Sequence, residues 1–345
     1  MKINGDYPVY GGGNISYYIN QYNREDDIII AKDGISANCI RYEKNKFFLN
    51  HHGWTLIFKD DTIIKKYMFY YLQSIQPELL SIAKGMAQLG INQENFYKIK
   101  IPIPSIEKQL EIVEYLDFIY DNIIKKNIKK IEDIKKLNKY YLSLNISFNT
   151  ELEIKTLGEV CEFQNGYSFK STDYEDQTAT NIGILQIKSI QNGYININKI
   201  TEYITENQKY KLYEIKKGDI LIALSGATTG KIGLYDLDKI FYLNQRVGKI
   251  NVKNSDIINY KYIYYWYICL DIDNKILNLA KGTAQPNIST NDISEIKIQI
   301  PPIEKQLEIV EYLNFNNDLI KTLEKENEIN KNNAEQLLKN VLYKD

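Results

Sequence analysis

Few residues of this 345-residue chain have the type and spacing that catalysis or metal binding requires. The two histidines, His51 and His52, are neighbours, and neighbours on a strand point to opposite faces and cannot act at one site. The three cysteines are far apart and odd in number, which favours reduced thiols over disulfides or a thiolate metal site. The glycine run at 11–13 lacks the Lys-Ser/Thr that completes a phosphate loop, and HExxH and GxSxG motifs do not occur. These observations predict a chain that is not an enzyme on its own and holds no metal or cofactor.

Composition limits the remaining functions. Lys and Arg number 43 against 44 Asp and Glu, so the chain has no overall basic field and any nucleic-acid surface must be local. With 44% hydrophobic and 25% charged residues the chain should fold, and its length predicts two or more domains. The longest mostly apolar stretch, at 262–272, is too short and too rich in tyrosine to span a bilayer. Because the start has no apolar signal segment, the predicted location is the cytoplasm.

A long internal repeat is the strongest feature of the sequence. Residues 99–116 read IKIPIPSIEKQLEIVEYL and residues 296–313 read IKIQIPPIEKQLEIVEYL, with 16 of 18 positions identical. Shorter matches precede both copies in the same order: DDIIIAKDG with GDILIALSG, FFLNHH with FYLNQR, and AKGMAQ with AKGTAQ. A period of about 200 residues indicates one module used twice as two domains. Aligned on the first of these matches, Met1 corresponds to about Gly193, so the first domain should lack the opening of the second.

Each module should begin as a mixed α/β domain. The apolar runs DIIIA and DILIAL are bounded by Asp and by Gly-containing turns, as buried strands are. Asp33 and Asp219 lie beside these strands and are expected to be cap or turn residues rather than catalytic acids. Aromatic-rich stretches at 60–75 and 256–270 should form helices that pack on the sheet.

A long helix should follow each mixed domain, starting at a proline boundary. Between residues 106 and 144, apolar residues recur at steps of three and four, which predicts an amphipathic helix of about 40 residues and about 60 Å. The second copy, from Ile303, carries Asn317, Asn327 and Asn330, and two interpretations stay open: buried residues that fix the register, or solvated surface. Each apolar stripe needs a partner, so the two helices are expected to pack as an antiparallel coiled coil in a pseudo-two-fold molecule.

The order of these motifs resembles the specificity subunit of type I restriction–modification systems. LGEVCEFQNGYSF at 157–169 looks like the opening of a target-recognition domain, and GDILIALSGATTGKIG, LNQRVGKI and AKGTAQPNIS look like its successive internal motifs. IPPIEKQLEIVEYL looks like its exit into a spacer helix. In the first half, YPVYGGGNISYYI, DDIIIAKDG and NHHGW look like a second, divergent recognition domain.

The resemblance implies a mixed α/β protein of four segments. Residues 1–105 would form the first target-recognition domain, N-terminally incomplete relative to the second, and 106–150 the first spacer helix; residues 151–302 would form the second recognition domain and 303–345 the second spacer helix. It further implies a non-catalytic subunit that reads a bipartite target in double-stranded DNA. Two methyltransferase subunits would bind the helices, restriction and translocase subunits would join them, and S-adenosylmethionine and ATP would belong to these partners, with no membrane involved.

The predicted DNA contacts are polar loop residues at matched places of the two domains. In the first domain these are Lys32, Asn38, Arg41, His51, His52, Lys84 and Gln88. In the second domain they are Ser225, Thr228, Thr229, Lys231, Asn244, Gln245, Arg246, Lys281, Thr283 and Gln285. Domains that read different sequences should share structural residues and differ at base contacts. Gln245 and Arg246, against His51 and His52, are therefore better candidates for base contacts than the residues that both halves share.

The predicted methyltransferase contacts lie at the two helix starts. They are Glu107, Gln109, Glu111, Glu304, Gln306 and Glu308. Because IEKQLEIVEYL occurs twice, it presents the same surface twice and suits two copies of one partner.

Two other functions stay open. The chain could be a solitary or truncated recognition protein without a working restriction complex. It could also be a coiled-coil scaffold whose domains bind protein or sugar, which the near-neutral charge permits and the motif order argues against.

Overall fold

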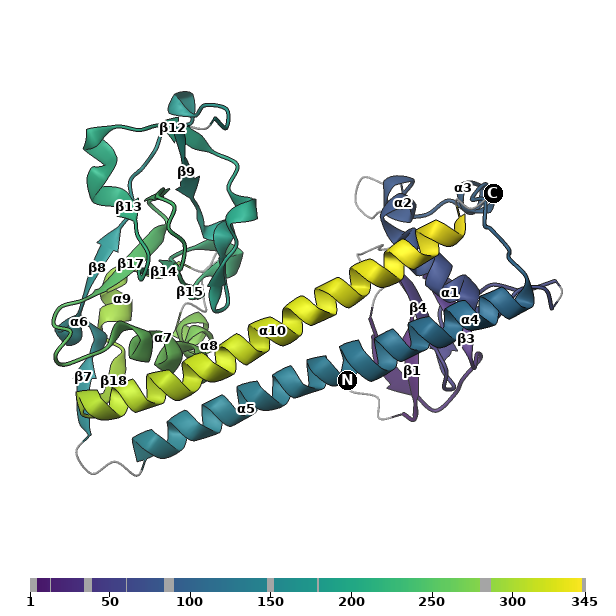
Figure 1. Ribbon diagram of the computed structural model, residues 1–345, viewed down its shortest axis with the longest axis horizontal. Coiled ribbons are helices and arrows are strands. Elements are labelled where there is room, and N and C mark those ends of the chain that lie inside the picture. Colours follow the sequence, from purple (N-terminus) through teal and green to yellow (C-terminus); the bar gives the residue numbers. More distant parts are fainter. Residues whose placement is uncertain are drawn as a thin grey trace. The chain divides into compact units, whose positions relative to one another are not determined.

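The computed structural model describes residues 5–12, 14–33, 39–59, 61–83, 90–147, 152–178, 180–279 and 287–342. The chain divides into two compact units: unit 1 contains residues 1–130 and 322–345, and unit 2 contains residues 131–321. Each unit combines small sheets with helices (Figure 1). The predicted class, a mixed α/β protein of two domains with long helices, is therefore confirmed.

The described residues of unit 1 form two small sheets and several short helices. Strands β2 (Tyr17–Ile19), β1 (Tyr7–Tyr10) and β5 (Phe48–Leu49) form one sheet in that order, and β4 (Ile40–Glu43), β3 (Asp27–Ala31) and β6 (Gly53–Trp54) form the other. The helices are α1 (Lys65–Ser74), α2 (Gln76–Ser81), α3 (Gln93–Tyr97) and α4 (Ile106–Asp117). Helix α1 packs on β3 and β4 and on α4 (Figure 1).

The described residues of unit 2 form two four-stranded sheets and two strand pairs. The strand order of one sheet is β12 (Tyr203–Thr205), β9 (Asn181–Leu185), β16 (Phe241–Leu243) and β13 (Glu214–Ile215). The strand order of the other sheet is β15 (Ile232–Leu234), β14 (Ile220–Ala223), β17 (Val247–Val252) and β8 (Cys161–Asn165). The pairs are β10 (Ile190–Gln191) with β11 (Tyr194–Ile195), and β18 (Lys297–Ile300) with β7 (Glu153–Thr156). The short α-helices are α6 (Leu157–Val160), α7 (Tyr260–Cys269), α8 (Ile272–Leu279) and α9 (Thr290–Ser294). The 3-10 helices are η2 (Ser171–Asp173), η3 (Ile187–Ser189), η4 (Ile197–Lys199), η5 (Gln208–Tyr213) and η6 (Gly226–Thr228).

The two units repeat one strand arrangement. Strand β1 pairs in parallel with β5 and antiparallel with β2, as β9 does with β16 and β12. Strand β3 lies between β4 and β6, as β14 lies between β15 and β17. Tyr10 at the end of β1 therefore matches Leu185 at the end of β9. The alignment of Met1 with Gly193 is wrong, because the loops that follow β1 and β9 differ in length.

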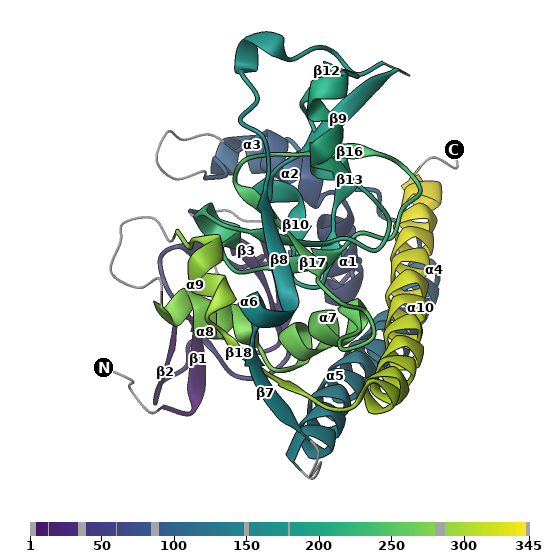
Figure 2. The same cartoon turned by 90° about the vertical axis from the view of Figure 1, so that its left-hand side faces the viewer.

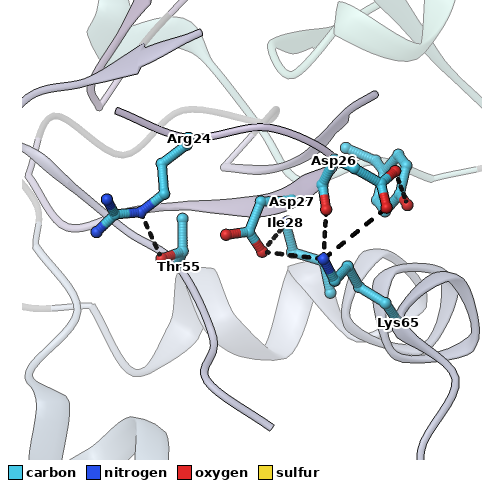
Figure 3. A network of polar contacts seen from close by, with 7 residues as sticks. Arg24, Asp26, Asp27, Ile28, Thr55 and Lys65 are labelled. Atoms are coloured by element: carbon cyan, nitrogen blue, oxygen red, sulfur yellow. Dashed lines mark hydrogen bonds and ion pairs between the residues drawn. The ribbon is translucent and has the colours of Figure 1, made fainter. Parts of the chain in front are cut away.

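Acidic residues fix the entry of the central strand in each unit. In unit 1, the Asp27 carboxylate accepts a hydrogen bond from Ile28 N at 3.0 Å and lies 4.0 Å from the Lys65 ammonium, which also contacts the backbone oxygen of Asp26 (Figure 3). The start of α1 is thereby tied to the start of β3. In unit 2, Asp219 accepts from Lys216 N at 2.8 Å and lies 3.5 Å from Lys249 Nζ. The prediction that Asp219 is a turn residue is confirmed.

Tyrosines attach the aromatic helices to the chain segment before each long helix. Tyr67 of α1 donates to the backbone oxygen of Pro102 at 2.9 Å, and Tyr262 of α7 donates to that of Gln299 at 2.6 Å. Both tyrosines are buried, at 1% and 0% exposure, so their hydroxyls need such partners. The predicted helices at 60–75 and 256–270 are confirmed, with later first residues.

Both predicted long helices exist. The first continues from α4 through a π-helical segment, η1 (Phe118–Ile124), into α5 (Lys125–Ser147), and the second, α10 (Ile303–Leu342), is α-helical throughout. In unit 1, α4 packs against the last part of α10 through a buried cluster that includes Ile112, Leu116, Ala334 and Leu338. In unit 2, α5 packs against the first part of α10 through Leu142, Ile309, Val310 and Leu313. Within each unit the paired segments run antiparallel.

Paired asparagines lie between the helices in both units. In unit 2, Asn316 Nδ2 donates to Asn138 Oδ1 at 2.6 Å, and in unit 1, Asn127 Nδ2 donates to Asn327 Oδ1 at 3.0 Å. Asn327 is 8% exposed and is a buried register residue. Asn316, at 6% exposure, takes the place on the seam that the sequence pattern gave to Asn317.

Candidate nucleic-acid interface

A three-residue turn follows the parallel strand in each unit. In unit 1 it is Asn50–His51–His52 after β5, and Asn50 Oδ1 accepts a hydrogen bond from His52 N at 2.9 Å. In unit 2 it is Asn244–Gln245–Arg246 after β16, and Asn244 Oδ1 accepts from Arg246 N at 3.3 Å. The shared asparagine therefore shapes the turn, and the two residues after it are exposed and differ between the units.

The same backbone contacts fix each turn against the end of the central strand. The carbonyl of His52 accepts from Lys32 N at 2.9 Å, and that of Arg246 accepts from Leu224 N at 3.0 Å. Lys32 O then accepts from Ile91 N at 3.1 Å, and Leu224 O accepts from Ile288 N at 2.9 Å. One backbone frame thus presents different side chains in the two units.

The histidine pair corrects one sequence-based prediction. The His51 and His52 rings lie with their centroids 3.8 Å apart, so the expectation that the two side chains point to opposite faces is wrong. The physical reason is that these residues form a turn, where the two-residue alternation of a strand does not apply. His52 Nδ1 lies 3.3 Å from Asp33 Oδ2, and both side chains are partly exposed. The turn therefore presents a joint surface of two imidazoles and a carboxylate.

The matching turn of unit 2 presents unpaired polar groups. Within the part of the chain that the structure describes, the side chains of exposed Gln245 and Arg246 make no hydrogen bond or ion pair. Ser225, which takes the place of Asp33, has a buried hydroxyl without a hydrogen-bond partner among those residues. A guanidinium and a side-chain amide with free donors can hydrogen-bond base edges or phosphates.

Polar side chains of the loop that follows β14 make contacts inside unit 2. Thr229 is 1% exposed and donates to Gly226 O at 2.7 Å, so its prediction as a DNA contact is wrong because its hydroxyl is buried and used. Thr228 is half-buried and donates to Ile187 O at 3.0 Å. Lys231 is half-buried at the entry of β15. Gly226 has φ of +78°, a conformation that favours glycine, in keeping with its place in both halves of the repeat.

Arg41 on β4 lies mostly inside unit 1. Its Nη2 donates to Gly11 O at 3.0 Å and its guanidinium carbon lies 5.7 Å from the centre of the Tyr10 ring. Nε and Nη1 are buried without a partner in the described part of the chain, and burial lowers the pKa of Arg41. Gly233 holds the matching place on β15, where a Cβ would lie 2.8 Å from the backbone of Tyr194. The two units therefore diverge at this position.

Six other predicted DNA contacts lie outside the described residues. They are Asn38, Lys84, Gln88, Lys281, Thr283 and Gln285. Lys32 is half-buried beside the turn of unit 1.

The loops after β1 and β9 were not among the predicted DNA contacts. These strands run parallel to β5 and β16, so their ends lie beside the two turns. Asn14 and Ser16 are exposed in the loop of unit 1, and Lys199 is exposed in that of unit 2. In unit 2, Lys188 Nζ lies 3.1 Å from Glu202. The signal in the sequence was the unequal length of the two loops between otherwise matching motifs.

The starts of the two long helices form a second repeated surface, but the two glutamines predicted to lie on it are buried. Gln109 and Gln306 are both 0% exposed, so the prediction that they contact a methyltransferase is wrong. Gln109 donates to Thr62 O and Pro104 O at 2.8 and 2.9 Å and accepts from Ile64 N at 2.7 Å. Gln306 donates to Ile257 O and Pro301 O at 2.9 and 2.8 Å and accepts from Asn259 N at 2.8 Å. Each glutamine thus fixes the start of α1 or α7 against its long helix.

The predicted glutamates, in contrast, lie on the surface. Glu107, Glu111, Glu304 and Glu308 are exposed, and Lys108 and Lys305 each lie 2.7 Å from the glutamate three residues later. Hydrogen bonds from its own backbone and from Ser105 lower the pKa of Glu107.

Exposed apolar residues accompany these glutamates in both copies. Leu110 and Phe118 are 54% and 56% exposed, and the matching Leu307 and Phe315 are 50% and 70% exposed. On a helix these positions share the face that carries the glutamates. We name each set, a leucine and a phenylalanine with the adjoining glutamates, a helix-start patch.

The described residues contain no group of three His, Cys, Asp or Glu side chains placed to hold a metal ion. In the same residues, no helix has the length and apolarity needed to cross a membrane.

Comparison with known proteins places both halves of the chain in one family. The model of the type I restriction modification DNA specificity domain matches residues 2–135 and 149–333. The type I restriction enzyme MjaVIII specificity subunit of Methanocaldococcus jannaschii is 30% identical over 88% of this chain and 75% of its own length. A putative type I restriction enzyme specificity subunit of Haemophilus influenzae is 26% identical over 91% of this chain and 80% of its own.

A solved structure has the same fold. The crystal structure of the type I restriction-modification system S subunit from M. genitalium superposes with a TM-score of 0.60 at 19% identity, covering 99% of this chain and 89% of the other. These matches favour a specificity subunit rather than a coiled-coil scaffold whose domains bind protein or sugar. With the specificity domain matched twice, this chain belongs to the family of type I restriction–modification specificity subunits.

Proposed function

We propose that each unit reads one half of a bipartite target in double-stranded DNA through its Asn-x-x turn. One observation carries the proposal: the same backbone frame holds His51 and His52 in unit 1 and Gln245 and Arg246 in unit 2. A shared frame with different exposed polar side chains suits two readers of different base sequences. Arg pairs with guanine and Gln with adenine, and imidazole can donate to or accept from a base edge.

Substitution of Arg246 tests the reading by unit 2. Arg246→Ala should lower specific binding by about 1–3 kcal/mol if the guanidinium pairs with guanine. The target is first defined by sequencing methylated DNA from cells that express the chain with its methyltransferase, and affinity is then measured on duplexes with either half-site altered. The loss should appear only on duplexes that retain the half-site of unit 2.

Two substitutions control this experiment. His52→Ala should weaken binding through the other half-site, and Lys331→Ala, at an exposed position on α10, should leave affinity unchanged. A loss that is equal on unrelated DNA would make Arg246 a phosphate contact, and no loss at all would remove it from the interface.

We further propose that the chain itself catalyses no reaction. Methyltransferase subunits with S-adenosylmethionine would supply methylation, and restriction and translocase subunits with ATP would supply cleavage, with the assembly acting on DNA in the cytoplasm. The two helix-start patches support the docking of two copies of one partner, since the same side chains recur and are at least half exposed in both copies.

The stoichiometry of the complex follows from these patches. Native mass spectrometry of the chain co-expressed with its methyltransferase should give two methyltransferase copies per chain. A complex with a single copy at saturating methyltransferase would contradict equal use of the two patches.

A further inference from the structure

The carboxylate of Asp33 and the imidazole of His52 form a pair at the surface of unit 1. His52 ends the turn that connects β5, in the sheet of β1 and β2, to β6, in the sheet of β3; β1 and β2 lie side by side in Figure 2. Asp33 lies two residues after the end of β3, and its Oδ2 lies 3.3 Å from His52 Nδ1. The Asp33 and His52 side chains are 38% and 46% exposed, so a ligand can reach both.

Backbone hydrogen bonds hold the two residues of this pair in place. The carbonyl of His52 accepts from Lys32 N at 2.9 Å and from Asp33 N at 3.4 Å, and Asp33 also forms an antiparallel bridge with Gly90. Among the described residues, no lysine or arginine pairs with the Asp33 carboxylate. The imidazole of His52 is therefore the side chain that this carboxylate contacts in that part of the chain.

The chemistry of the pair decides which hydrogen bond the outer nitrogen of His52 can make. A carboxylate only accepts hydrogen bonds, so Nδ1 must carry the proton that it donates to Asp33. In a neutral imidazole one nitrogen donates and the other accepts, so a proton on Nδ1 leaves Nε2 as an acceptor. His52 can then pair with a hydrogen-bond donor of a base, but not with an acceptor.

The matching turn of unit 2 has the opposite hydrogen-bonding character. Arg246 takes the place of His52, and a guanidinium donates but never accepts. Ser225 takes the place of Asp33, and its hydroxyl makes no hydrogen bond among the described residues. Because a guanidinium has no tautomer to fix, Arg246 needs no carboxylate beside it. The acidic residue thus occurs in the unit whose turn ends with a side chain that has two tautomers.

We propose that Asp33 is a positioning residue that makes His52 an acceptor, so that unit 1 reads a base with an exocyclic amino group at the position that His52 faces. In the major groove, adenine offers such a donor at N6 and cytosine at N4, whereas guanine and thymine offer only acceptors there. This role rests on the proposed function, in which the turn of unit 1 reads bases, and it adds the chemical class of base that the turn selects.

The tautomer of His52 can be measured without DNA. Long-range ¹H–¹⁵N correlation spectra of the full-length chain, labelled with ¹⁵N-histidine, contain the signals of two histidines, and His51→Gln assigns them. Nε2 lies two bonds from both carbon-bound ring protons and Nδ1 from only one, so the cross-peak pattern shows which nitrogen carries the proton. At about pH 8, where an ordinary imidazole is neutral, Nδ1 of His52 should be protonated. A proton on Nε2 instead would overturn the proposal.

The base is identified with the chain and its methyltransferase together. The target is defined by sequencing methylated DNA, and the position that His52 faces is the one where His52→Ala removes the base preference. That base should be adenine or cytosine, and the sequence shows which. Replacing its amino group by hydrogen, with purine for adenine or 2-pyrimidinone for cytosine, should weaken binding by the parent about five- to tenfold and by His52→Ala no more than about twofold.

Asp33→Asn tests the positioning role itself. The amide has the size of the carboxylate but can donate as well as accept, so the spectrum should show both tautomers of His52. The preference for the amino base over guanine or thymine should then fall about threefold or more. An unchanged preference at the half-site of unit 2 shows that the variant is folded. Asp6→Asn, at an exposed position before β1, is the matched control and should alter neither the spectrum nor the preference.

The outcomes separate this role from the proposed function. Guanine or thymine at the position, an equal loss in the parent and in His52→Ala, or an unchanged preference in Asp33→Asn would each contradict the role of Asp33 while leaving unit 1 a reader of bases. If His52→Ala changed no base preference, the reading proposed for the turn of unit 1 would itself fail, whichever nitrogen of His52 carries the proton.

Discussion

Replacing Gln306 with alanine is expected to lower the free energy of unfolding of unit 2 by about 3–5 kcal/mol. The Gln306 side chain is 0% exposed and hydrogen-bonds two carbonyls and one backbone N–H at 2.8–2.9 Å. Alanine would leave these three buried groups without partners, and each unsatisfied buried polar group costs about 1–3 kcal/mol. Urea unfolding followed by hydrogen exchange of unit 2 amides would measure the loss.

The matched substitution in unit 1 should behave in the same way. Gln109→Ala removes the equivalent three hydrogen bonds and should destabilise unit 1 rather than unit 2. Glu308→Ala, at an exposed position two residues beyond Gln306, is the control and should change stability by about 0.5 kcal/mol or less. If the two glutamine variants were as stable as this control while losing a methyltransferase, the glutamines would be partner contacts after all.

The inward direction of these glutamines could have been predicted from the helix period. Gln109 precedes Ile112 by three residues and Leu116 by seven, and both of these are buried, so all three share one face. The repetition of the whole segment suggested one partner surface for Gln109, Glu107 and Glu111. Repetition alone does not separate a surface kept for a partner from an internal contact kept for the fold.

The turns show the opposite case, in which the sequence comparison was informative. Shared Asn50 and Asn244 shape the backbone, and the differing residues after them are exposed, as the comparison of the two halves indicated. The closeness of His51 and His52 could not be predicted, because it depends on Asn50 ending the strand. The seam could not be placed to one residue either, since Asn316 and Asn317 fit steps of three and four equally well.

Replacing Leu307 and Phe315 together with serine is expected to remove one of the two methyltransferase copies that we propose to bind the chain. Both side chains are at least half exposed, at 50% and 70%, so the fold does not depend on burying them. Full burial of one Leu or Phe side chain contributes about 1.5–3 kcal/mol, and because these two side chains are already partly covered, the double variant should lose about 2–4 kcal/mol at that patch. This corresponds to a roughly 30- to 700-fold weaker site. Native mass spectrometry at a methyltransferase concentration that just saturates the parent chain would resolve complexes with one and two copies.

The repeat provides a matched variant for this experiment. Leu110→Ser with Phe118→Ser should remove the other copy, and the four substitutions together should leave the chain without methyltransferase. Ile329→Ser is the control, because Ile329 is 50% exposed on the same helix α10 but stands outside the repeated segment. Retention of both copies by both double variants would exclude the patches as docking sites. Loss of both copies from a single double variant would mean that the two partners bind cooperatively rather than through two independent copies of one surface.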